Sequence, residues 1–291
     1  MPLYENRYWV SEDGLKLHYR DYPGGADRPP ILCMPGLTRN ARDFEDLAAR
    51  LSPEWRVIAP SFRGRGKSEY AKDPMTYVPP TYVRDVTALL DALALPSIIA
   101  FGTSLGGIVT MLLAAAQPRR IAGALLNDVG PDIEPAGLGR IRAYVGKSNT
   151  WPTWMHAARA VAEANDDIYP GYAIEDWLAM AKRLYRLNSS GRIVLDYDMK
   201  IAEPFRVPGN EAGPDMWHAL EQLKKVPVLV VRGERSDVLG ATTADRMVKA
   251  LDQAELVTIP GVGHTPTLGE PEAASAIDRL LTRIATEPVA A

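Results

Sequence analysis

The sequence predicts an α/β protein with a mostly parallel, doubly wound sheet, an antiparallel hairpin at its amino-terminal end and an inserted helical segment. Short, nearly continuous apolar runs recur along the chain, and such runs are typical of strands covered on both faces. Amphipathic segments separate these runs, so strands and helices alternate. Residues 131–213 lack the apolar runs and carry tryptophan and methionine among helix-forming stretches, which indicates a helical insertion.

The first part of the chain supplies the hairpin and four strands. The hairpin is predicted over Tyr8–Val10 and Leu15–Tyr19, because the turn Glu12-Asp13-Gly14 separates them and apolar and polar residues alternate in the second segment. The next predicted strands are the apolar runs Ile31–Met34, Val57–Ala59, Ser97–Phe101 and Ala122–Leu126. The clearest helix begins near Pro79-Pro80-Thr81 and places four apolar residues on one face, namely Val86, Leu89, Leu90 and Leu93.

The alternation resumes after the insertion. Strands are predicted at Val226–Val231 and Glu255–Ile259, with helices at Thr243–Leu251 and after Glu270-Pro271. We therefore expect one sheet domain built from residues 1–130 and 214–291, interrupted by a helical cap over residues 131–213. A single domain of 291 residues buries roughly 75% of its extended-chain surface, which is enough for a sizeable core.

Composition excludes several classes of protein. Hydrophobic residues make up 46% and charged residues 24% of the chain, which excludes wholesale disorder and collagen-like repeats, and the lone Cys33 cannot form an internal disulfide. A net charge of -3 gives no basic surface for nucleic acid or anionic membrane. The first residues lack the apolar stretch of a secretory signal, so we expect a cytoplasmic protein with a small-molecule partner. The sequence allows a homo-oligomer without specifying one.

The most informative motif is Gly-x-Ser-x-Gly at residues 102–106, between an apolar strand and a helix. A sharp turn from strand to helix lifts one side chain above the sheet edge, and the flanking glycines avoid clashes between a Cβ atom and the neighbouring backbone. The hydroxyl of Ser104 is therefore predicted to be an exposed nucleophile. The apolar run 97–117 that contains the motif is broken by glycines and is not expected to span a membrane.

A serine nucleophile needs a base, and His264 is the best candidate among four histidines. It lies in the loop after the strand Glu255–Ile259, at the carboxyl edge of the sheet where open α/β sheets gather their sites. The acid that orients the imidazole is predicted to be Asp237, which follows the strand Val226–Val231. Asp128, which follows the neighbouring strand Ala122–Leu126, is the alternative.

Two backbone N–H groups are predicted to form an oxyanion hole. The amide of Leu105 lies at the start of the helix after Ser104. The second donor should come from the loop after Ile31–Met34, where the N–H of Leu37 is our choice. The sequence has neither a His-Glu-x-x-His motif nor a Cys/His cluster, and we expect neither a metal nor another cofactor.

The chain resembles the α/β-hydrolase fold superfamily, in its branch of capped esterase-like enzymes. The likeness covers nearly the whole chain and includes Ser104, Asp237 and His264, the glycine-containing loop at Gly36 with Phe44 downstream, and the Arg-Gly-x-Gly-x-Ser turn at residues 63–68. Relatives usually have histidine and aspartate at the positions that Pro35 and Ser61 occupy here. The resemblance implies the α/β-hydrolase fold. Ser104 argues against the haloalkane dehalogenase and epoxide hydrolase relatives, which are similar in fold but use an aspartate nucleophile.

These residues predict a serine esterase. Ser104 would attack the carbonyl of a small to medium apolar ester, and water activated by His264 would release the acyl group. Cap residues are expected to line the acyl pocket, and the candidates are Trp151, Trp154, Met155, Trp177, Met180 and Tyr185. The same triad serves carbon–carbon bond hydrolysis, lactone hydrolysis, perhydrolysis and cofactor-free lyase or oxygenase chemistry in relatives, and a ligand receptor without turnover is a third alternative.

Overall fold

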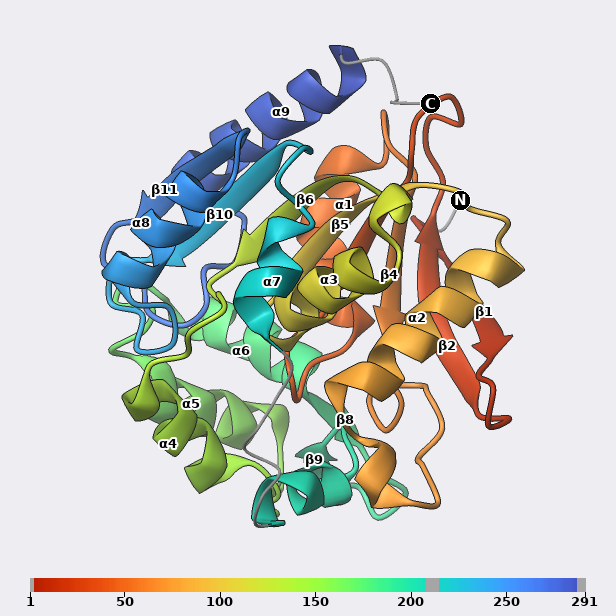
Figure 1. Ribbon diagram of the computed structural model, residues 1–291. Coiled ribbons are helices and arrows are strands. Elements are labelled where there is room, and N and C mark those ends of the chain that lie inside the picture. Colours follow the sequence, from red (N-terminus) through yellow and green to blue (C-terminus); the bar gives the residue numbers. More distant parts are fainter. Residues whose placement is uncertain (1–2, 208–214, 287–291) are drawn as a thin grey trace.

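The computed structural model describes residues 3–207 and 215–286, and its centre is an eight-stranded sheet (Figure 1). The strands lie in the order β1-β2-β4-β3-β5-β6-β10-β11. Their bounds are β1 Glu5–Val10, β2 Lys16–Tyr22, β3 Ile31–Met34, β4 Val57–Ser61, β5 Ile98–Thr103, β6 Ile121–Asn127, β10 Val228–Gly233 and β11 Ala254–Ile259. The pairs β1–β2 and β2–β4 are antiparallel and all other neighbours are parallel, which confirms the predicted sheet with its amino-terminal hairpin.

Helices cover both faces of the sheet. One face is covered by α1 (Glu45–Leu51) and α9 (Pro271–Thr286), and the other by α2 (Pro79–Ala92), α3 (Leu105–Ala116), α7 (Met216–Glu221) and α8 (Ala241–Ala250). Strand β3 shows why its apolar run is continuous, because Leu32 and Met34 pack on the second face while Ile31 and Cys33 pack on the first. Burial also raises the pKa of the Cys33 thiol. Short 3₁₀ helices lie at Ala41–Phe44 (η1), Pro74–Thr76 (η2) and Pro118–Arg120 (η3).

The segment between β6 and α7 forms a layer of its own, drawn in green beside one end of the sheet strands (Figure 1). It contains α4 (Pro135–Tyr144), α5 (Trp154–Asn165), α6 (Ile174–Leu184) and the 3₁₀ helix η4 (Met199–Arg206). It also contains a small antiparallel sheet, in the order β7-β9-β8, formed by Thr150–Trp151, Ile193–Leu195 and Tyr185–Leu187. The predicted helical insertion thus also contains a small sheet, which the sequence did not reveal because strands of two or three residues are too short for a periodic pattern.

Part of the predicted insertion, residues 208–213, lies outside the described residues. In the ranges that are described, no helix has both the length and the apolar character needed to cross a membrane.

Candidate active site

Ser104 occupies the sharp turn between β5 and α3. Its backbone has φ 51° and ψ −116°, a region that costs energy for any residue with a Cβ atom. The glycines on either side make the turn sterically feasible, since a Cβ on Gly102 would lie 2.4 Å from the carbonyl oxygen of Gly106, and one on Gly106 would lie 2.0 Å from that of Met34. The Gly-x-Ser-x-Gly pattern is thus a packing requirement that presents the Ser104 hydroxyl at the sheet edge.

His264 lies in the loop after β11, with its Nε2 atom 3.0 Å from the Oγ atom of Ser104. The Nδ2 group of Asn127, at the end of β6, donates a 2.9 Å hydrogen bond to the carbonyl oxygen of Pro266 and fixes this loop to the sheet. Of the His264 side chain 9% is exposed, so the ring is largely shielded from water. The other three histidines lie in other elements, His18 in β2, His156 in α5 and His218 in α7.

Asp128 is the carboxylate beside His264. Its Oδ2 atom lies 2.7 Å from the Nδ1 atom of His264 and accepts a 2.7 Å hydrogen bond from the Ser236 hydroxyl, while its Oδ1 atom accepts a 2.9 Å bond from the N–H of Gly233. An ionised carboxylate only accepts, so this network assigns the imidazole proton to Nδ1. The Nε2 atom is then free to accept the proton of Ser104.

The placement of Asp237 beside His264 was wrong, and the alternative, Asp128, holds that position. Asp237 instead accepts two hydrogen bonds from Arg140 of α4, at 2.6 and 2.7 Å. These bonds lower the pKa of Asp237 below its ordinary value. The physical reason lies in the turn after β10, which directs Ser236 toward Asp128 and the next side chain toward the inserted segment.

The two predicted oxyanion donors belong to the helix that begins after Ser104 and to the loop that passes beside it. Leu105 is the first residue of α3, and Leu37 follows Gly36 in the loop after β3. Within the described residues, neither backbone N–H donates to an intramolecular acceptor. The carbonyl oxygen of Leu37 accepts a 2.8 Å bond from Nε of the fully buried Arg65, which fixes the orientation of the loop. This arrangement is suited to binding an oxyanion.

The turn at residues 63–68 is tied to the amino-terminal hairpin and to α2. Arg63 is buried and donates to Asp85 at 2.6 and 2.7 Å and to Asp13 at 2.8 and 3.0 Å. Hydrogen bonds from Arg63 lower the pKa of Asp13 to about 2. Ser61, which stands where relatives usually have aspartate, accepts a 3.2 Å bond from the N–H of Ala41 through its hydroxyl. Its role is therefore to hold the loop after β3.

A cavity of about 640 Å³ opens onto Ser104 and His264. Its walls come from the loop after β3, from α4 and the residues after it, from α5 and α6, and from the small sheet. Besides Ser104 and His264, the lining includes Gly36, Leu37, Arg39, Asp43, Arg140, Tyr144, Lys147, Asn149, Tyr169 and Tyr197. The inserted segment thus supplies much of the surface that a substrate would meet.

Three of the six predicted pocket residues line this cavity, namely Trp151, Met180 and Tyr185. The other three do not. Trp177 is buried in the core of the inserted segment, Trp154 packs against that core, and Met155 is 40% exposed. Because helices α5 and α6 pack against each other, Trp177 and Trp154 face the core of the inserted segment and Met155 faces solvent, rather than Ser104.

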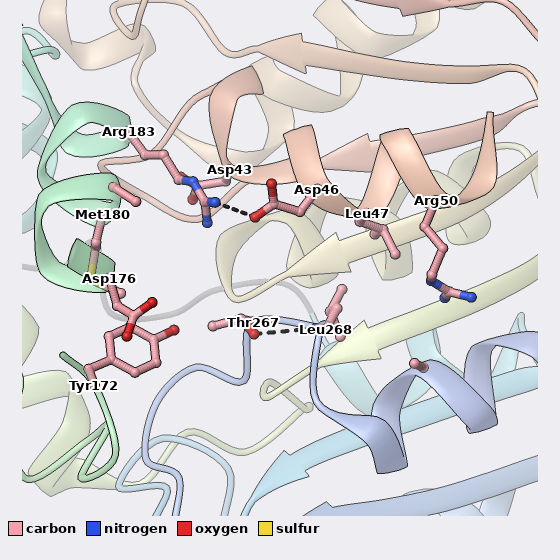
Figure 2. Close-up of a pocket in the computed structure, with 13 residues that line it drawn as sticks. Asp43, Asp46, Leu47, Arg50, Tyr172, Asp176, Met180, Arg183, Thr267 and Leu268 are labelled. Carbon is pink, nitrogen blue, oxygen red and sulfur yellow. Dashed lines mark hydrogen bonds and ion pairs between the residues drawn. The ribbon is translucent and has the colours of Figure 1, made fainter. Parts of the chain in front are cut away.

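Figure 2 shows a second cavity, of about 330 Å³, between α6, α1 and the residues that precede α9. Arg183 of α6 forms an ion pair with Asp46 of α1 across it. Asp43 and Met180 belong to the walls of both cavities. Neither Ser104 nor His264 lines the smaller cavity, so the larger one is the candidate active site.

No group of three or more histidine, cysteine, aspartate or glutamate side chains in the described ranges is arranged to hold a metal ion.

The comparisons with known proteins agree with this fold. Residues 31–277 match the model of the Alpha/beta hydrolase family. A 3-hydroxybutyrate-oligomer hydrolase from Cupriavidus necator is 34% identical over 270 residues, which cover 90% of this chain and 92% of that protein. The chain belongs to the alpha/beta hydrolase family. With hydrolases as its relatives over nearly the whole length, this family member is a hydrolase.

Two further proteins are similar to this alpha/beta hydrolase. A 2-(acetamidomethylene)succinate hydrolase from Mesorhizobium japonicum is 28% identical over 258 residues, which cover 89% of this chain and 88% of that protein. The crystal structure of an alpha/beta hydrolase from Novosphingobium aromaticivorans is 58% identical, with a TM-score of 0.93, and the match covers 97% of this chain and 99% of that one. The fold is therefore shared along almost the entire chain.

Proposed function

We propose that this hydrolase cleaves carboxylic esters through an acyl-enzyme intermediate, with Ser104 as nucleophile, His264 as general base and Asp128 as the orienting acid. The observation that carries the proposal is the continuous pair of hydrogen bonds, 3.0 Å from Ser104 to His264 and 2.7 Å from His264 to Asp128. A nucleophile, a base and a third group that orients the base are the components of triad catalysis.

The first half-reaction forms the acyl-enzyme. His264 takes the hydroxyl proton of Ser104 at Nε2 while the serine oxygen attacks the ester carbonyl. The negative charge that develops on the carbonyl oxygen is stabilised by the N–H groups of Leu37 and Leu105, which have no competing acceptor within the described residues. His264 then gives its proton to the departing alcohol, and the carbonyl reforms as a Ser104 ester.

The second half-reaction releases the acid. A water molecule loses a proton to Nε2 of His264 and attacks the acyl carbonyl, and collapse of the second tetrahedral intermediate returns the proton to Ser104. Asp128 stabilises the imidazolium at both stages. Its own charge is held by Gly233 and Ser236, and it is fully buried.

The inserted segment, predicted as residues 131–213, acts in this proposal as a cap that selects the substrate. Trp151, Met180 and Tyr185 offer apolar surface for the carbon chain of the ester. The relative from Cupriavidus necator acts on 3-hydroxybutyrate oligomers, so short oligomers of a hydroxy acid are the first natural substrates to test.

The test compares wild type with Ser104→Ala on p-nitrophenyl esters from acetate to octanoate. We expect Ser104-dependent release of p-nitrophenol, with kcat lower by about 10⁴- to 10⁶-fold in the variant because the triad acts as a unit. A chain-length optimum would give the size of the acyl pocket. Release no faster than that of Ser104→Ala across the series would reject ester hydrolysis and favour the carbon–carbon and lactone alternatives.

A further inference from the structure

Two arginines line the catalytic cavity, and each is held by its own carboxylate. Arg39, in the loop after β3, donates from Nε and Nη2 to Asp43 at 2.5 and 2.9 Å. Arg140, in α4, donates from Nε and Nη2 to Asp237 at 2.6 and 2.7 Å. Bidentate pairs of this kind fix the plane of a guanidinium group, so both groups are pre-positioned before a ligand arrives.

The same pairing leaves the Nη1 amino group of each arginine available. Within residues 3–207 and 215–286, neither Nη1 group donates a hydrogen bond. Neither of them belongs to the buried polar atoms that have no hydrogen-bond partner. The side chains are 26% exposed for Arg39 and 38% for Arg140, which means that a ligand in the cavity can reach them. Arg39 also lies close to the nucleophile, since a Cβ atom on Gly36 would be 3.4 Å from its Cγ and 3.7 Å from the Cβ of Ser104.

Three lysine or arginine side chains line the cavity, and two of them are paired with carboxylates. Arg39 is neutralised by Asp43 and Arg140 by Asp237, whereas Lys147, exposed at the cavity wall, has no ion pair in the described part of the chain. Hydrogen bonds to Asp237 raise the pKa of Arg140, which therefore remains charged. Lysine and arginine N–H donors that have no partner of their own suit an anionic group such as a carboxylate.

We propose that the ester substrate of this enzyme carries a carboxylate besides the scissile ester, and that Arg39, Arg140 and Lys147 bind it. The proposal rests on the ester hydrolysis proposed above and adds the class of substrate. Guanidinium groups match the geometry of a carboxylate, and hydrogen bonds between ionised groups are stronger than neutral ones. The carboxylate would hold the far end of the substrate while Ser104 attacks its ester.

The experiment uses two substrates that differ only at the proposed contact. One is the linear dimer of 3-hydroxybutyric acid with its free carboxylate, and the other is the same dimer capped as the primary carboxamide. We expect wild type to cleave the acid with kcat/KM at least about 10-fold higher than that of the amide, because a hydrogen bond to an ionised group is about twice as strong as a neutral one and the difference in energy corresponds to about tenfold. Chromatography of the released hydroxy acid measures both rates.

Three variants locate the preference. The double variant R140Q/D237N removes the donor and its carboxylate together and keeps the net charge, so it should bring the acid-to-amide ratio of kcat/KM close to one. Lys147→Met should lower that ratio in part. Arg142→Gln is the matched control, because Arg142 lies exposed in the same helix and does not line the cavity. It should keep the wild-type ratio. Melting temperatures confirm that each variant is folded.

Binding to Ser104→Ala separates this proposal from the proposed function. Calorimetry on that variant compares the affinity of acid and amide without turnover, and we expect the acid to bind at least about 10-fold more tightly. If no ester is cleaved in a Ser104-dependent way but the acid binds more tightly, ester hydrolysis fails and the anion site stands. Equal affinity within twofold, or a preference that survives in R140Q/D237N, would overturn the anion site.

Discussion

Replacing Asp128 by asparagine tests the geometry of the triad. The carboxylate is fully buried and surrounded by donors, with the Gly233 N–H at Oδ1 and both the Ser236 hydroxyl and His264 Nδ1 at Oδ2. Asparagine has one acceptor and one donor in place of two acceptors. If its oxygen stays with Gly233, its amino group faces Nδ1 of His264, which must then lose its proton.

The consequence for catalysis follows from the tautomer. A proton that leaves Nδ1 moves to Nε2, where His264 can no longer accept from Ser104. The opposite orientation turns the amino group toward the buried N–H of Gly233 and costs about 1–3 kcal/mol for the unsatisfied donor. We therefore expect kcat to fall by about 10⁴-fold, which corresponds to about 5 kcal/mol in the activation free energy.

The assay measures kcat on p-nitrophenyl acetate, a neutral ester, for Asp128→Asn and for Asp237→Asn. Asp237 pairs with Arg140 in a partly exposed contact worth only about 0.2–1 kcal/mol, so its variant should retain kcat within about threefold. Melting temperatures show whether both variants fold. Loss of turnover in Asp237→Asn together with retained turnover in Asp128→Asn would refute the assignment of the acid.

Three further predictions concern the surroundings of the triad and the core. Ser236→Ala removes one of the hydrogen bonds to the catalytic carboxylate and should lower kcat by about 10-fold with KM within twofold, and S236T should restore much of the rate. Burial lowers the pKa of His18 from 6.5 to about 4, so the unfolded chain binds a proton that the folded protein excludes. The free energy of unfolding should therefore fall by up to about 3 kcal/mol between pH 6.5 and pH 4. In urea titrations, H18Q should show a smaller dependence of the unfolding free energy on pH. Gly106→Ala places a Cβ atom 2.0 Å from the carbonyl oxygen of Met34 and should cost several kcal/mol or abolish folding, whereas Gly139→Ala in α4 meets no atom within 4 Å and should stabilise by about 0.5–1 kcal/mol.

Each of these predictions has a contrary outcome. Wild-type kcat in Ser236→Ala would show that the hydroxyl does not position the acid. An unchanged pH slope in His18→Gln would assign the acid sensitivity to other groups. Equal melting temperatures for Gly106→Ala and Gly139→Ala would mean that the backbone at Met34 moves freely, contrary to the packing of the turn.

The core of the fold could be predicted from the sequence because its signals are local. A run such as Ile31–Met34 alternates between two buried faces, so every residue is apolar and the strand is visible without any tertiary information. The turn at Ser104 is equally local, since the positions that exclude a Cβ atom lie two residues to either side of it. His264 followed from its place after the last strand.

The acid could not be decided from the sequence because two aspartates follow neighbouring strands at the same sheet edge. Which one reaches His264 depends on backbone directions in the loops. Asp128 comes directly after β6 with φ 56°, a conformation that aspartate tolerates better than most residues, whereas Asp237 lies four residues beyond β10 and pairs with α4. No local pattern distinguishes these two arrangements.

The cavity wall was predicted only in part for a related reason. Amphipathic helices show which residues avoid water, but Trp177 is apolar because it packs inside the inserted segment, while Met180 one turn away lines the cavity. Arg39 was missed although its spacing of four residues from Asp43 is a readable signal of an ion pair. Ser236 and Arg140 carry no such signal, because their partners are distant in the sequence.

The most direct test of the account is to identify the covalent intermediate. Wild-type enzyme mixed rapidly with p-nitrophenyl acetate and quenched in acid within the first turnovers should carry one acetyl group, and fragmentation of the digested protein should locate it on Ser104. Ser104→Ala should remain unmodified under the same conditions. Turnover by the wild type with acetyl on another residue, or persistent turnover in Ser104→Ala, would contradict the proposal that Ser104 is the nucleophile of an ester hydrolase.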